Sequence, residues 1–206
     1  MSGTAKMTPY RSFGELARRE PKEGTYRIEY RRGTSGIAVM AIHGGGIEPG
    51  TTEIAEAIAG RDHSFYSFTG IKSGGNWQLH VSSRCFDEPV GLHMAETARL
   101  VVTIHGCKGN QAAVYLGGRH LLLKKSISEA LKAAEFSAGG NPQFPGETLQ
   151  NICNRGRLKR GVQLELTRAL RNAFFFDLSY ACGRSRQKPP FARFVSAVRS
   201  ILAAER

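Results

Sequence analysis

The chain has 206 residues, of which 41% are hydrophobic and 22% charged, and this balance excludes a disordered or fibrous protein. Its 29 Lys and Arg residues against 17 Asp and Glu residues give a net charge of +12, which favours a polyanionic partner such as a nucleic acid, an anionic lipid or an acidic polymer. The four cysteines are widely spaced and form no C-x-x-C pair, which argues against a zinc ribbon or a thioredoxin motif.

The length fits one domain. We expect residues 1–11 to form a flexible N-terminus and residues 12–206 to form a single domain that folds without disulfides. The N-terminus lacks the apolar segment of a signal peptide, and no apolar run has the length of a transmembrane helix. The sequence therefore predicts a cytoplasmic protein without a membrane partner, and we expect a monomer.

The first elements follow from capping and periodicity. The S-x-x-E pattern at 12–15 has the spacing of a capping box and predicts a helix over Phe13–Arg19. Apolar and charged residues alternate over 26–30, which predicts a half-exposed strand at a sheet edge. The continuous apolar run over 37–43 predicts a buried strand.

The rest of the chain alternates between helix-like and strand-like segments. Thr51 or Thr52 is the predicted N-cap of a helix that begins near Glu53 and ends at Gly60, and Asp87 is the predicted cap of the next helix. The remaining predicted strands cover 65–71, 78–82, 100–106, 112–116 and 162–166, and the remaining predicted helices cover 89–98, 126–136, and segments starting at 167 and 189. This order predicts an α/β fold with a mixed, mainly parallel sheet flanked by helices.

Two of the buried strands end in the same way. The first ends in His43, which three glycines and then Glu48 follow, and the strand over 100–106 ends in His105 and Gly106. If these strands are parallel neighbours, both histidines lie at the edge of the sheet where ligands of open α/β sheets bind. Two imidazoles and a carboxylate, with a fourth position left open, are a ligand set of catalytic zinc. The sequence therefore predicts one zinc ion bound by His43, Glu48 and His105, although a lone histidine at a strand end is commonly structural.

A possible general base lies on another strand. The segment 162–166 alternates strictly, so Gln163 and Glu165 share one face. Hydrolysis needs a group that takes a proton from water and delivers it to the leaving amine. Glu165, on the polar face of an otherwise apolar strand, is our candidate for this role. The alternative is a structural glutamate paired with one of the many arginines.

Four segments of the chain resemble a known family. They are the AIHGGGIEPGT run at 41–51, the Ile104-His105-Gly106 step, the segment Asn151–Arg155 and the strand Gly161–Leu166. Together they are similar to the phage poly-γ-glutamate hydrolases, a family that includes phage-related "replication proteins" of bacterial chromosomes. The resemblance extends over about residues 10–171, and its most specific part is the glycine-rich run.

The resemblance implies a compact relative of the zinc carboxypeptidases, with a mixed sheet between helices. It implies that His43, Glu48 and His105 bind zinc and that Glu165 occupies the position of the catalytic glutamate. Zinc carboxypeptidases separate the first histidine and the glutamate by three residues, whereas here the separation is five. Glu48 is therefore the weaker ligand assignment, and His80 is an alternative ligand.

The resemblance also implies a substrate. Poly-γ-glutamate carries one free carboxylate per residue, which fits a basic protein. Arg84, Asn154 and Arg155 are our candidates for binding substrate carboxylates or polarising the scissile carbonyl, although each arginine could equally be a solvated surface residue. The protein would then be phage- or prophage-encoded and released on lysis.

Two other functions remain open at this point. One is a zinc amidase that acts on another acidic substrate or on cell-wall peptide. The other is a basic replication accessory protein that binds nucleic acid. The sequence contains no helix-turn-helix, zinc-finger pattern or basic patch interleaved with aromatic residues, so we expect no nucleic-acid partner.

Overall fold

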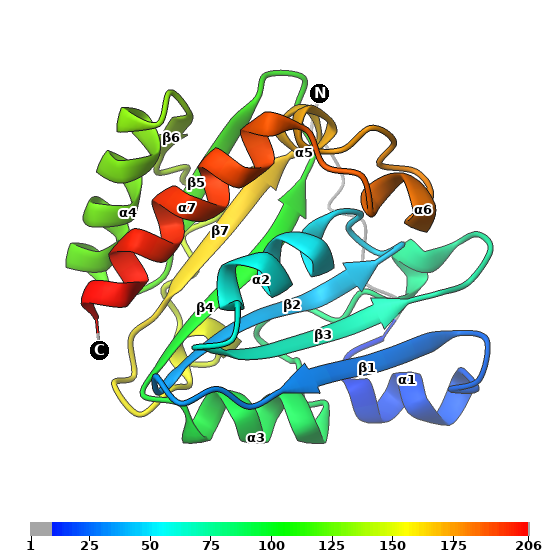
Figure 1. Ribbon diagram of the computed structural model, residues 1–206. Coiled ribbons are helices and arrows are strands. Elements are labelled where there is room, and N and C mark those ends of the chain that lie inside the picture. The colour runs from blue at the N-terminus through cyan, green and yellow to red at the C-terminus, as the bar shows by residue number, and fades with distance from the viewer. Residues whose placement is uncertain (1–9, 206) are drawn as a thin grey trace.

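The computed structural model describes residues 10–205. These residues form one seven-stranded sheet with helices on both faces (Figure 1). Most of the segment expected to be a flexible N-terminus lies outside the described residues. Tyr10, at the end of that segment, is buried and its hydroxyl donates a hydrogen bond to Glu20 Oε1 at 2.8 Å.

The sheet has the strand order β1-β3-β2-β4-β7-β5-β6. Its four central strands, β3, β2, β4 and β7, run parallel, whereas β1 pairs antiparallel with β3 and β5 pairs antiparallel with β7. The short β6 runs parallel to β5. The strands are β1 (Tyr26–Arg31), β2 (Ile37–Gly45), β3 (Ser64–Gly70), β4 (Leu100–Cys107), β5 (Ala113–Gly117), β6 (Ser137–Gly139) and β7 (Val162–Thr167). The predicted mixed, mainly parallel sheet is confirmed.

The helices form two layers with the sheet between them. The helices are α1 (Phe13–Arg19), α2 (Thr51–Ala59), α3 (Pro89–Thr97), α4 (Leu121–Ala133), α5 (Arg168–Phe174), α6 (Ala181–Arg184) and α7 (Pro189–Ala204), with 3-10 turns η1 (Asn76–Leu79) and η2 (Ile152–Asn154). One apolar cluster joins the sheet to α2, α4, α5 and α7, and a second joins its other face to α1, α3 and both 3-10 turns. We call these the α7 face and the α3 face.

The alternation of each strand decides which cluster a residue enters. In β4, Leu100, Val102 and Ile104 pack on the α7 face, while Val101 packs on the α3 face. All nine residues of β2 are buried, because both faces of this central strand are covered. The apolar run at 37–43 thus forms the buried strand that was predicted, and the helix predicted to start at 189 is α7.

The structure differs from the prediction at 78–82, which form no strand. The Asn76 amide donates to Lys72 O at 2.7 Å, and its oxygen accepts the Lys72 N–H at 2.9 Å. These bonds close a turn that leads into η1 rather than into an extended segment. The apolar residues Leu79 and Val81 are nevertheless buried, so burial without regular structure produced the strand-like pattern.

Three predicted helix caps were also wrong. Helix α2 begins after Gly50, which has φ +95°, and Thr51 instead donates its hydroxyl to Glu48 O at 2.8 Å. Glu88 caps α3 in place of Asp87. Helix α4 begins at Leu121 because the His120 ring accepts the Leu123 N–H at 3.2 Å, so residue 126, where the sequence predicted the helix to begin, lies inside it.

Among the described residues, no helix has the length and apolar character needed to span a bilayer.

Candidate metal centre

The first histidine of the site is turned into place by an irregularity in β2. Val39 and Ala41 pack on the α7 face, so strict alternation would place His43 on that face as well. The pairing of β2 with β3 shifts register between Ala41 and Gly44, and His43 Nε2 contacts Val81 O, next to residues of the α3 face. Bulges of this kind re-aim side chains beside functional sites.

Glycine is required immediately after this histidine. A Cβ on Gly44 would lie 2.2 Å from Ser67 Oγ and 2.2 Å from Thr52 Oγ1, and Gly45 has φ +62°. The turn then brings Glu48 back to the strand end, where its N–H donates to His43 O at 2.9 Å. The five-residue separation is therefore closed by a backbone hydrogen bond, and Glu48 reaches the site from a loop.

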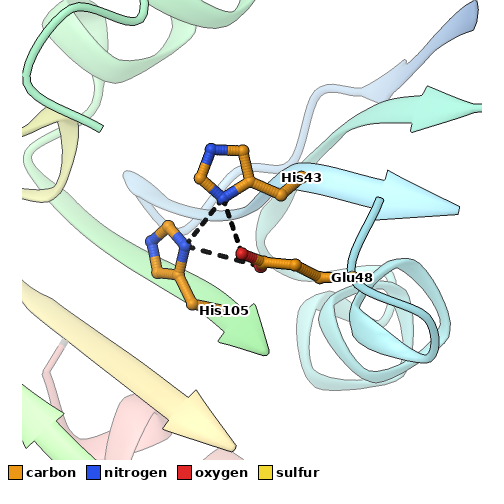
Figure 2. Close-up of side chains that lie close together, drawn as sticks. All are labelled: His43, Glu48 and His105. Atoms are coloured by element: carbon orange, nitrogen blue, oxygen red, sulfur yellow. Dashed lines mark hydrogen bonds and ion pairs between the residues drawn. The ribbon is translucent and has the colours of Figure 1, made fainter. Parts of the chain in front are cut away.

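Three side chains from three segments converge at the carboxyl ends of β2 and β4 (Figure 2). His43 Nδ1 lies 3.1 Å from Glu48 Oε1 and 3.3 Å from His105 Nδ1, and His105 Nδ1 lies 3.8 Å from Glu48 Oε2. Ligands about 2.0–2.1 Å from a tetrahedral ion lie roughly 3.3–3.5 Å apart. The geometry of His43, Glu48 and His105 therefore fits one zinc-sized ion, and their ligand atoms all lie within 4.8 Å of one another.

Second contacts fix how these ligands are oriented. His43 Nε2 lies 2.7 Å from Val81 O, and because a carbonyl only accepts, Nε2 carries a proton. In the neutral ring Nδ1 then presents its lone pair toward His105. The Gly106 N–H donates to Glu48 Oε2 at 2.8 Å. Such outer contacts set the tautomer and direction of metal ligands.

His80 lies beside the site but in a different relation to it. Its ring stacks on His43 with centroids 3.8 Å apart, and its Nε2 lies 3.7 Å from Glu48 Oε1. It is half-buried, whereas His43 and His105 are each 2% exposed. The three residues whose ligand atoms best fit one metal ion are the predicted His43, Glu48 and His105, and His80 packs against them.

Charges in this cluster are strongly coupled. Burial raises the pKa of Glu48, but the three surrounding histidines outweigh burial and lower it to about 2. Burial lowers the pKa of His43, yet the Glu48 carboxylate raises it above the ordinary value. Burial lowers the pKa of His105 to about 4 and that of His80 to about 3. Glu48 is thus an anion and His105 a neutral imidazole at pH 7, as metal ligands must be.

Glu165 enters the same site from β7. It is the direct register partner of His105 in the parallel β4–β7 pair and of Tyr115 in the antiparallel β5–β7 pair. Burial and then the charge of Glu48 raise the pKa of Glu165 to about 8, against an opposing effect of Arg171. No hydrogen bond or ion pair to its carboxylate is found among residues 10–205, where Arg171 acts on it only as a nearby charge, so the alternative of an arginine ion pair is not supported.

A pocket of about 720 Å³ contains all of these groups. Its lining includes the three candidate ligands, His80 and Glu165, and also residues that sequence reasoning did not select: Ser82, Ser83, Lys108, Tyr115, Asn141 and Phe144. Tyr115 stacks on Phe144 with centroids 6.2 Å apart. Strand β5 reads as an ordinary apolar strand, and only its antiparallel pairing beside β7 brings Tyr115 to the site.

Arg171 fixes the backbone behind the pocket. Its guanidinium donates to Pro49 O at 2.7 Å, Cys107 O at 3.1 Å and Leu166 O at 3.2 Å. These carbonyls follow Glu48, His105 and Glu165 by one or two residues. Arg171 is 4% exposed, and its role was not predicted because nothing in the local sequence distinguishes it from other helical arginines.

The three candidate substrate-binding residues lie outside the pocket lining. Asn154 is fully buried and uses both donors and its oxygen on backbone groups at Gly146, Thr148, Arg119 and Gly161. Arg155 pairs with Glu96 at 3.2 Å, and Arg84 is exposed next to the pocket residue Ser83. A substrate contact by Asn154 therefore has no support from its surroundings, while those of the arginines stay predictions.

The fold and the site define an α/β protein with a candidate metal centre of two histidines and one glutamate at the carboxyl edge of its parallel strands. Residues 10–197 match the poly-gamma-glutamate hydrolase family, and the chain belongs to this family. It is thus a member of a hydrolase family, in agreement with the resemblance in the sequence.

Individual relatives agree with this assignment. The chain is 34% identical over 200 residues to UPF0714 protein YmaC of Bacillus subtilis (strain 168), covering 95% of this chain and 84% of YmaC. It is 31% identical over 192 residues to UPF0714 protein YndL of the same organism, covering 92% of this chain and 75% of YndL. It is also 29% identical over 196 residues to the SPbeta prophage-derived UPF0714 protein YoqZ, covering 94% and 71% of the two chains.

Two solved structures share the whole fold. A bacteriophage poly-gamma-glutamate hydrolase superposes with a TM-score of 0.92 at 31% identity, covering 96% of this chain and 97% of the other. A zinc-free apo form of YndL superposes with a TM-score of 0.90 at 31% identity, covering 96% and 98%.

Proposed function

We propose that this protein is a zinc-dependent hydrolase that cleaves γ-glutamyl amide bonds of poly-γ-glutamate. The observation that carries the proposal is the convergence of His43, Glu48 and His105 in one pocket with a carboxyl group, Glu165, that has no ion-pair partner among the described residues. Family membership and the apo YndL structure, which is described as zinc-free, support both the reaction and the metal.

The ligand set fits zinc by chemistry as well as by distance. Two buried histidine nitrogens and one carboxylate are an established set for catalytic zinc, and their spacing suits a tetrahedral ion. When bound, zinc polarises the scissile carbonyl and lowers the pKa of water toward ~7. His43, Glu48 and His105 would hold the ion, and the backbone contacts at Val81 and Gly106 keep two of these ligands in place.

Glu165 performs the proton transfers in this proposal. It takes a proton from the attacking water and delivers it to the leaving amine as the amide bond breaks. Burial raises the pKa of Glu165 to about 8 in the metal-free site, and a divalent cation bound beside it would lower that pKa and favour the carboxylate that accepts a proton. Its register position beside His105 directs it to the same part of the pocket as the ligands.

Basic residues at the pocket favour an acidic substrate. Lys108 and Tyr115 line the pocket, and Arg168 lies in an adjoining pocket that shares Lys108. These groups offer a cation and a hydroxyl to a substrate carboxylate. In a γ-linked chain every α-carboxylate lies beside the scissile amide, whereas in an α-linked chain carboxylates lie at the ends of side chains.

The test is a comparison of two polymers with protein of known zinc content. We expect cleavage of poly-γ-glutamate by the zinc-loaded protein, little cleavage of poly-α-glutamate at the same concentration, and loss of activity with a chelator. Equal rates on both polymers would contradict γ specificity and leave a zinc amidase of broader range. Full activity in demonstrably metal-free protein would contradict the zinc mechanism.

A further inference from the structure

Basic residues extend from the pocket rim to the opposite edge of the sheet. Arg84 follows Ser82 and Ser83, which line the pocket, and Arg155, Arg157, Lys159 and Arg160 follow one another in the loop before β7. We call these five residues the basic track. Because β7 runs parallel to β4, the loop that precedes it lies at the amino edge of the parallel strands, at the far end from the metal centre.

Backbone hydrogen bonds join the two parts of the track. The Ile152 N–H donates to Ser83 O at 2.9 Å, which places η2 directly against the pocket rim beside Arg84. Turn η2 leads to Arg155, whose N–H donates to Ile152 O at 3.1 Å. The Arg157 N–H then donates to Ala98 O at 2.9 Å and fixes the distal part of the track against the end of α3.

The track carries charge that the protein itself does not neutralise. Arg155 pairs with Glu96, but the other four residues are exposed and form no ion pair with a carboxylate among residues 10–205. Lys159 is held with φ +52°, a conformation that a lysine rarely adopts, by a turn in which its N–H donates to Gly156 O at 2.8 Å.

A further cation, Arg99, lies near the distal end of the track. Arg99 accepts the Leu158 N–H on its backbone oxygen at 3.1 Å, so it lies beside the loop of the track. Its side-chain Nη2 is buried and has no hydrogen-bond partner among the described residues. A buried guanidinium nitrogen without an acceptor is costly, and the charge of Arg99 adds to the positive potential at this end of the track.

We propose that the basic track binds the carboxylates of a poly-γ-glutamate chain outside the pocket, holding one polymer while its γ-glutamyl bonds are cleaved. The inference rests on the proposed function, and continuity with the pocket rim carries it. Single-stranded nucleic acid is less favoured because its binding sites add aromatic residues on which bases stack. The exposed aromatic residues of the described chain lie on other segments: Tyr30, Trp77, Phe176 and Tyr180.

The experiment compares two variants of equal net charge. The track variant carries Arg157→Gln, Lys159→Gln and Arg160→Gln. The control variant carries Lys125→Gln, Lys132→Gln and Arg193→Gln on α4 and α7, which cover the opposite face of the sheet. Each variant removes three cations, so both net charges fall from +12 to +9.

Two readouts are needed. For the track variant we expect the ratio of kcat/KM on long poly-γ-glutamate to kcat/KM on a short γ-glutamyl oligomer to fall about tenfold at low salt, as when three exposed ion pairs are lost together. We expect the same variant to bind the polymer about tenfold more weakly in metal-free protein, where no cleavage occurs. The control variant should keep both values of the wild type.

Several outcomes would overturn the inference. An unchanged ratio in the track variant, or an equal loss in the control variant, would show that position on the surface is irrelevant. If single-stranded DNA displaces the bound polymer at a lower concentration of negative charges than free poly-γ-glutamate does, the track is a nucleic-acid site. If wild-type protein cleaves neither substrate, the proposed function fails, whereas the metal-free binding comparison still decides the role of the track.

Discussion

His105 and Glu165 are direct partners in the register of the parallel strands β4 and β7. A candidate metal ligand and a candidate general base therefore occupy adjacent positions on one face of a rigid sheet. Strands hold such groups in a more fixed geometry than loops do. The pairing keeps both side chains in the lining of the pocket. This pairing makes Glu165 the most informative residue to change.

Glu165→Gln should separate catalysis from metal binding. Glutamine keeps the shape of the side chain but cannot accept a proton, and a general base contributes about 10²–10⁴-fold to rate. We expect the variant to fold, to retain zinc, and to lose at least about 100-fold in kcat on poly-γ-glutamate. Metal analysis and steady-state kinetics check this together. Activity within a few-fold of wild type would assign the proton transfer to another residue.

The same substitution should change how stability depends on pH. Burial and the Glu48 charge raise the pKa of Glu165 to about 8, whereas an unfolded glutamate has a pKa near ~4.3. Between these values the folded state holds a proton that the unfolded state releases. The free energy of unfolding therefore falls as pH rises, by up to ~1.4 kcal/mol per pH unit.

In metal-free protein we therefore expect Glu165→Gln to gain stability relative to wild type between pH 5 and 8, in the window that the two pKa values define. Urea denaturation in the presence of a chelator measures the difference. Titrating groups away from the site are common to both proteins and cancel, and the pKa of the coupled Glu48, about 2, lies below this window. If the free energy of unfolding depends on pH in the same way in both proteins, the raised pKa of Glu165 is contradicted.

Zinc content should distinguish the ligands from their neighbour. His43→Ala and His105→Ala each remove one of three ligands, and we expect both to lose most bound zinc. His80→Ala removes a ring that stacks on His43 but is not a member of the best-fitting set, so we expect it to retain about one zinc per chain. Elemental analysis of protein purified without added metal tests all three. Zinc loss in the His80 variant alone would place the metal elsewhere.

Arg171→Met should destabilise the protein strongly. It leaves three carbonyls without their donor, two in buried and one in part-buried hydrogen bonds, and each unsatisfied buried group costs roughly 1–3 kcal/mol. We expect a loss of about 3 kcal/mol or more in the free energy of unfolding, with a smaller loss for Arg171→Lys. The exposed neighbour Arg168 is a matched control, and Arg168→Met should change stability by less than about 0.5 kcal/mol. Equal effects at both positions would show that the three bonds contribute little.

The elements that could be predicted from the sequence are those that one local signal determines. The apolar run before His43, the glycines after it and the repeated strand-histidine-glycine ending predicted the neighbouring parallel strands, and the strict alternation around Glu165 predicted its strand. These signals depend on burial and on backbone freedom, and both are properties that the type of a single residue indicates.

Other parts depend on pairing between distant segments and left no local signal. The bulge that turns His43 onto the α3 face is visible only in the pairing of β2 with β3. The position of Tyr115 follows from the antiparallel insertion of β5 beside β7. His80 reached the site from a turn, although its surroundings resembled a strand. Asn154 matched a family segment, but its side chain is used by backbone groups of neighbouring loops.

The contacts of Arg171 also bear on the order in which the molecule is assembled during synthesis. The three carbonyls that it joins come from segments around residues 49, 107 and 166, and Arg171 itself is later in the chain than all of them. Because a chain emerges from the ribosome amino end first, His43, Glu48 and His105 are exposed to the cell before β7 and α5 have been made. A nascent chain can therefore present the candidate metal ligands without the candidate general base or the guanidinium behind them, and the site is complete only when β7 and α5 have folded onto the sheet.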